Sequence, residues 1–120
     1  MESNVLQILS IFLLFIGESL AIYSEIAGAN KVASQNKISS ETFWWFFILI
    51  TIAGFPMIGG YFFGILVFKN IWIVSVVSIV SILIMEPILA YLIFKQFPTM
   101  GALIGFVLGS IGLVVTLVIK

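Results

Sequence analysis

The chain has 120 residues, 62% of them hydrophobic and 8% charged, and its five lysines balance its five glutamates. Soluble domains are usually about 45–50% apolar and about 25% charged, so water is not the main solvent for this surface. With no His, Cys, Asp or Arg in the sequence, we expect no enzyme activity, no metal, no cofactor, no disulfide and no nucleic-acid partner.

Four apolar segments are each long enough to cross a bilayer, which takes about 20 residues. They run from about 5 to 27, 42 to 68, 71 to 94 and 100 to 119. These segments predict an all-α integral membrane protein, with one domain over residues 1–120 and four transmembrane helices in a compact bundle surrounded by membrane lipid. Residues 29–41 form the only polar connection of any length.

The first segment carries small residues on one side, at about 100° per residue. They are Ser10, Gly17, Ala21, Ser24 and Gly28. Small residues let helices approach closely in lipid, so we expect this side to face another helix. Glu18 borders this side and is expected to point into the bundle. Glu25 lies near the membrane end of the segment and is a secondary candidate for a binding role.

The third segment carries a narrow polar seam, because Ser75, Ser78 and Glu86 lie within about 80° of one another. Glu18 and Glu86 both sit inside predicted spans that contain no lysine. A charged side chain there costs at least about 2.5–3.5 kcal/mol, and such residues usually mark a path for ions or substrates. A carboxyl group of this kind can exchange its proton for a cation. The alternative is a permanently protonated Glu that only donates a hydrogen bond between helices.

The fourth segment has a glycine face made by Gly101, Gly105, Gly109 and Gly112. The first three form two overlapping GxxxG units, which are typical of close helix packing in membranes. This face is predicted to pack either within the chain or between two copies of it.

The basic groups do not select an orientation in the membrane. Lys31, Lys37 and Lys95 fall on one side, and Lys69, Lys120 and the terminal amine on the other. Such a balance permits an antiparallel homodimer, and the alternative is one orientation fixed by a partner or by the insertion machinery. Residues 27–29 fit a signal-peptide cleavage site, but no basic residue precedes Lys31, so we expect no cleavage.

The run from Leu66 to Lys120 resembles the C-terminal part of an EamA-type repeat of the drug/metabolite transporter superfamily. The matching features are the run MEPILAYLIF, a short turn, and a helix with Gly105 and Gly112 seven residues apart. The length and four-helix layout resemble the small multidrug resistance branch. This resemblance implies a proton-coupled exporter in a prokaryotic inner membrane. It also implies an antiparallel dimer in which Glu18 binds both the proton and a cationic substrate.

The sequence departs from that pattern in two places. Lys95-Gln96 stands where EamA-type repeats tend to have Gly-Glu, and Ser75 and Ser78 stand where the small exporters carry Tyr and Trp. Three functions therefore stay open. The first is a proton-coupled exporter of a small cationic or polar metabolite, working as a homodimer or with a related subunit. The second is a non-transporting subunit of a larger membrane complex, and the third is one half of a lipid-linked sugar flippase.

Overall fold

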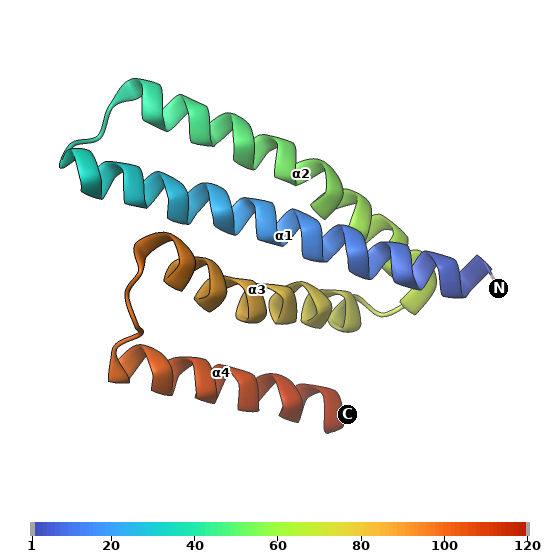
Figure 1. Cartoon of the computed structure of the whole chain (residues 1–120). Coiled ribbons are helices and arrows are strands. Elements are labelled where there is room, and N and C mark those ends of the chain that lie inside the picture. The colour runs from blue at the N-terminus through green and yellow to red at the C-terminus, as the bar shows by residue number, and fades with distance from the viewer. Residues whose placement is uncertain (1, 120) are drawn as a thin grey trace.

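A computed structural model of the chain describes residues 2–119 and consists of four helices joined by short connections (Figure 1). The helices are α1 (Glu2–Gln35), α2 (Ser40–Phe68), α3 (Ile71–Phe94) and α4 (Met100–Val118). Ser39, Asn70 and Thr99 cap the starts of α2, α3 and α4, each accepting a hydrogen bond from a backbone N–H of the first turn. The predicted all-α fold is confirmed.

The first helix is longer than predicted. It continues beyond the predicted span to Gln35, although residues 29–35 were expected to belong to the connection. Ala, Lys and Gln in this stretch are good helix formers, and water can solvate a helix that continues beyond the lipid. Asn36 then adopts a left-handed conformation with φ 54°, a usual way to end a helix. The connection therefore shrinks to residues 36–39.

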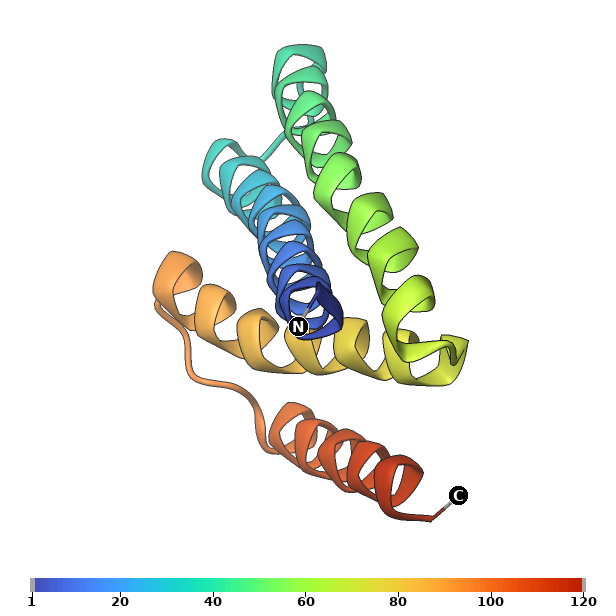
Figure 2. The ribbon, with the colours of Figure 1, turned by 90° about the vertical axis from the view of Figure 1, so that its right-hand side faces the viewer.

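The first helix lies between α2 and α3 in Figure 1, and Figure 2 shows that the C-terminal end of α2 also reaches the start of α3, while α4 lies on the outer side of α3. Successive helices run in opposite directions, so α1 and α3 are parallel and both ends of the chain lie at the same end of the bundle. Within residues 2–119, α1 contacts α2 and α3, whereas α4 contacts only α3. The bundle is flat, with principal extents of 50 × 33 × 18 Å.

The small-residue side of α1 packs against α2, which confirms the prediction that it faces another helix. Ser10 Oγ donates a hydrogen bond of 2.8 Å to the carbonyl oxygen of Gly60. At Gly17, a Cβ atom would lie 2.9 Å from the backbone nitrogen of Met57. Only a glycine at this position lets the two backbones come so close.

Most of the surface is apolar and suited to lipid. Phe55, for example, is 78% exposed, and many other large apolar side chains of α2 and α4 point outward. The helices α1, α2 and α3 are long and apolar enough to cross a membrane, and the described apolar part of α4, Met100–Thr116, is shorter. The nineteen residues of α4 nevertheless span about 28 Å, close to the hydrocarbon thickness of about 30 Å. The chain is an integral membrane protein.

Candidate functional site

The α1–α3 interface contains a buried carboxylate. Ser78 Oγ of α3 donates a hydrogen bond of 2.9 Å to Glu18 Oε1 of α1. Glu18 is 7% exposed and Ser78 is 5% exposed, so both lie inside the bundle. Two residues that the sequence singled out on separate segments are therefore brought together by packing of the parallel helices α1 and α3.

The local sequence explains why Glu18 is enclosed. Gly17, its neighbour on α1, packs directly on the α2 backbone, which draws this turn of α1 into the centre of the bundle. On α3, Val74 lies one turn before Ser78 on the same face and is fully buried, so Ser78 has an apolar neighbour in the interior. The Ser78 hydroxyl thus supplies hydrogen bonding in a place where water is scarce.

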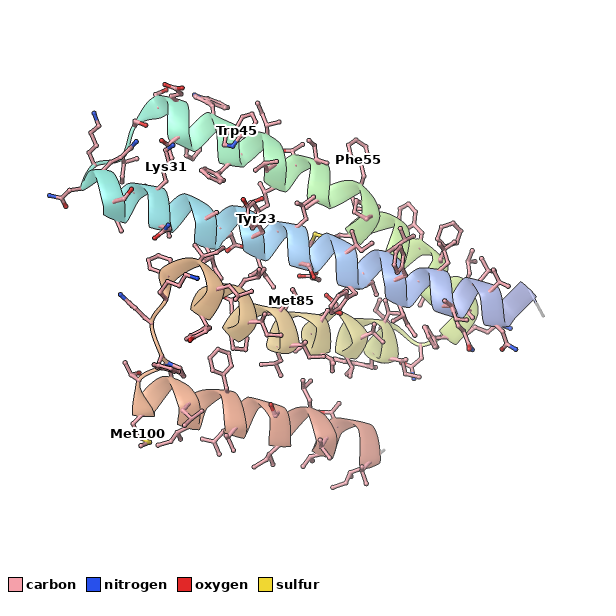
Figure 3. All side chains as sticks on the ribbon, viewed as in Figure 1. Tyr23, Lys31, Trp45, Phe55, Met85 and Met100 are labelled. Atoms are coloured by element: carbon pink, nitrogen blue, oxygen red, sulfur yellow. The ribbon has the colours of Figure 1, made fainter. Side chains whose placement is uncertain are left out.

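No basic side chain of the described chain neutralises Glu18. The lysines within residues 2–119 lie near helix ends or in connections, as Figure 3 shows for Lys31. A glutamate side chain deep in hydrocarbon either pairs with a cation or is protonated. The hydroxyl of Ser78 fits either state, because it can donate to a carboxylate and can accept from a carboxylic acid.

Neither Ser75 of the polar seam nor the nearby Ser81 joins this hydrogen bond. Ser75 is half-buried one turn before Ser78, and the hydrogen bonds of the described residues include none from it to Glu18. Ser81 is 4% exposed and donates to the carbonyl oxygen of Val77, a bond within its own helix. The polar seam therefore meets α1 at Ser78.

Glu86 lies farther along α3, near the level of Glu25 on α1. It is half-buried, while Glu25 of α1 is exposed. Glu25 follows Glu18 by seven residues and Glu86 follows Ser78 by eight, which is about two helical turns in each case, and α1 and α3 run in the same direction. Glu18 and Glu86 thus belong to two successive levels of one interface.

The glycine face of α4 is open. A Cβ added to Gly101, Gly105 or Gly112 would meet nothing within 4 Å, and one added to Gly109 would meet only Leu83 of α3, at 3.8 Å. In the described part of the chain, this face does not mediate close helix packing. Of the two predicted uses of this glycine face, packing between two chains therefore remains.

A groove of about 500 Å³ opens between α1 and α2, toward the end where they are joined. One wall is an aromatic and aliphatic face of α2, and Glu25 is the one charged residue in its lining. The α2 wall consists of Phe43, Phe46, Phe47 and Ile50. The sequence spacing of these four residues, i, i+3, i+4 and i+7, predicts that they share one face of a helix. The sequence does not predict that α1 and α2 diverge and so open the groove.

Comparisons with known proteins identify no relatives. The chain matches no family model, no curated protein and no solved structure.

Proposed function

We propose that this protein is a small membrane transporter that exchanges protons for a small cationic or polar metabolite. The observation that carries the proposal is the buried carboxylate of Glu18, which Ser78 binds and no lysine of the described chain neutralises. Intramembrane carboxylates without basic partners usually mark ion or substrate paths. The resemblance to small proton-coupled exporters assigns the same role to the glutamate of the first helix.

Charge balance suggests how the exchange works. Before substrate binds, Glu18 is protonated and neutral, and the Ser78 hydroxyl accepts from it or donates to its carbonyl oxygen. A monovalent cation that enters from one side of the membrane displaces the proton to that side and pairs with the carboxylate, while the Ser78 hydroxyl donates to Glu18 Oε1. The cation then leaves to the other side, and a proton from that second side binds to Glu18. In each state one proton or one monovalent cation neutralises the Glu18 carboxylate, so no unpaired charge is left in the hydrocarbon.

The working unit in this proposal is a dimer. A single chain is flat and leaves the glycines of α4 without close neighbours. A second subunit packing on this face would cover Gly101 and Gly105, where small residues let helices approach closely. The partner is a second copy, including an antiparallel one, or a related subunit. Two such subunits can enclose a solute that one flat layer cannot.

The test is an uptake screen in reconstituted vesicles with a proton gradient, using a panel of organic amines and polar metabolites. Glu18→Gln keeps the shape of the side chain but cannot exchange a proton. We expect it to lower gradient-driven uptake by about a hundredfold, the usual scale for losing an essential proton-transfer group. Glu41→Gln is the matched control, because Glu41 is an exposed residue of the first turn of α2. Equal uptake by Glu18→Gln and wild type contradicts the proposal, as does a panel in which no compound responds to the gradient.

A further inference from the structure

A polar pocket of about 340 Å³ lies between α1 and α2 at the end where the two helices are joined. Its lining holds one cation and one anion, Lys31 of α1 and Glu41 of α2, together with Trp45 (Figure 3). Both charged residues are exposed, and the hydrogen bonds within residues 2–119 include none between their side chains. The pocket therefore presents two opposite charges that a ligand can engage separately.

This end of the bundle lies at the level of the lipid headgroups. Trp44 and Trp45 are exposed here, and Lys95, which follows α3, begins the other connection on the same side of the bundle (Figure 1). Tryptophans gather at the membrane–water interface, and lysines gather in the connections just outside it. A lipid beside α1 and α2 therefore brings its headgroup to the polar pocket.

The polar pocket continues into the apolar groove between α1 and α2. The two share Thr42 and Phe46 in their linings. From this junction the groove follows α1 toward the middle of the bundle, from Ala33 to Ser24, about 14 Å. Its floor is closed, because Phe46 packs on Gly28, where a Cβ would meet the ring at 3.3 Å. Pocket and groove thus form one surface with a charged end and an apolar end.

The charges of the pocket select the kind of headgroup. Lys31 complements a phosphate, and Glu41 complements an ammonium group, so the pair suits a zwitterion better than an anion. A primary ammonium has three N–H donors for the Glu41 carboxylate, whereas a quaternary ammonium has none. Thr42 Oγ1 accepts a hydrogen bond of 2.8 Å from Ser39, which leaves its own O–H to donate at the junction. Glu25 lies at the far end of the groove and does not change this balance.

We propose that α1 and α2 bind one phospholipid with a phosphoethanolamine headgroup. Lys31 pairs with the phosphate, Glu41 binds the ammonium, and one acyl chain lies in the groove against Phe43 and Phe47. The inference does not depend on transport, because Lys31 lies thirteen residues, about 20 Å along α1, from Glu18.

The test is native mass spectrometry of the full-length chain in detergent micelles, which counts bound lipid directly. Phosphatidylethanolamine, phosphatidylcholine and phosphatidylglycerol with identical acyl chains are added at equal concentration. We expect about tenfold more bound phosphatidylethanolamine than phosphatidylcholine, the scale of one hydrogen bond to a charged group. Phosphatidylglycerol should also bind less, because it has no ammonium for Glu41. Soluble phosphoethanolamine should not displace the lipid, because it lacks the acyl chain. This comparison needs no substitution.

Three substitutions assign the contacts. Lys31→Gln should lower binding of phosphatidylethanolamine and phosphatidylcholine alike, because both carry the phosphate. Glu41→Gln should lower phosphatidylethanolamine to the level of phosphatidylcholine and leave the latter unchanged. Ala29→Phe should weaken all three lipids, because Ala29 is exposed and lines the groove. Lys37→Gln is the matched control for Lys31, since Lys37 is an exposed residue of the connection that does not line the pocket. Far-ultraviolet circular dichroism checks that each variant keeps its helices.

Four outcomes overturn the inference. Equal binding of phosphatidylethanolamine and phosphatidylcholine would remove the contact with Glu41. Strongest binding of phosphatidylglycerol, or an equal loss in Lys37→Gln and Lys31→Gln, would reduce the effect to a general attraction between lysines and lipid phosphates. Displacement by phosphoethanolamine would make the pocket a site for a soluble phosphate ester. Glu18→Gln should leave lipid binding unchanged, so failure of the proposed transport and failure of this inference are observed separately.

Discussion

Both α1 and α4 carry a face of small residues, but the structure covers only that of α1. On α1, Gly17 lies so close to α2 that a Cβ would meet the Met57 backbone at 2.9 Å. On α4, a Cβ at Gly105 would meet nothing within 4 Å. The spacing of small residues thus predicts that a face packs closely, but it does not tell which molecule supplies the other helix. The covered face positions Glu18 in the interior, and the open face is available to a second subunit.

The same substitution on the two faces should have opposite consequences. Gly17→Ala forces the α1 and α2 backbones apart, and we expect it to lower the free energy of unfolding by about 1–3 kcal/mol. Gly105→Ala meets open space and should stabilise α4 slightly, by up to about 1 kcal/mol, through its better helix propensity. Unfolding titrations in mixed detergent micelles measure both. Equal effects of the two substitutions would show that the covered and open faces are not different.

Ser78→Ala tests the hydrogen bond that the covered face makes possible. It removes the hydroxyl that donates to Glu18 Oε1. Because hydrogen bonds to charged groups contribute about 1.5–3 kcal/mol, we expect cation exchange to fall by at least about tenfold. Ser75→Ala is the control, since Ser75 lies one turn away in the same seam. If Ser75→Ala lowers cation exchange as much as Ser78→Ala does, the role that we assign to the Ser78 hydrogen bond is wrong.

Gly105→Leu tests the open face. Its side chain projects into space outside the single chain, so we expect the unfolding free energy of the monomer to change by less than about 0.5 kcal/mol. The proposed dimer should be lost, because a leucine prevents the close approach that GxxxG faces allow. Cross-linking in vesicles and analytical ultracentrifugation in detergent measure the oligomeric state. A dimer that tolerates Gly105→Leu uses a different surface.

Glu25→Gln should have the smallest effect on transport. Glu25 is exposed and lies at the level of Glu86, two turns from the Glu18–Ser78 hydrogen bond. We expect at least half of the wild-type uptake in vesicles that contain this protein alone. A loss as large as that of Glu18→Gln would mean that the two levels of the α1–α3 interface work as one site.

The sequence predicts helices better than it predicts neighbours. The predicted span 71–94 matches α3, because the long apolar run between Asn70 and Lys95 predicts one helix with these two ends. The end of α1 was placed too early, because polar residues that leave the lipid can still continue a helix. Helical periodicity predicted that Glu18 points into the bundle and placed Ser78 on the polar seam of the third segment. It could not show that they meet, since the side of a helix that faces inward does not specify which helix lies there.

The sequence could not predict the groove between α1 and α2 for the same reason. Phe43, Phe46 and Phe47 repeat on one face of α2, but so do residues that simply face lipid. Only the divergence of α1 and α2 makes these rings the wall of a groove with Glu25 inside it. Glu25 was therefore assigned to the membrane interface, although it also lines this groove.

The most direct measurement is infrared spectroscopy of the protonated carboxyl band across a pH series, comparing the wild type with Glu18→Gln in the same vesicles. The difference between the two isolates Glu18 from the other glutamates. If Glu18 exchanges protons, its band is present at low pH, disappears as the pH rises, and returns when the pH is lowered again. A Glu18 band that persists from mildly acidic to strongly alkaline conditions would contradict proton exchange and leave Glu18 only a hydrogen-bonding role between α1 and α3.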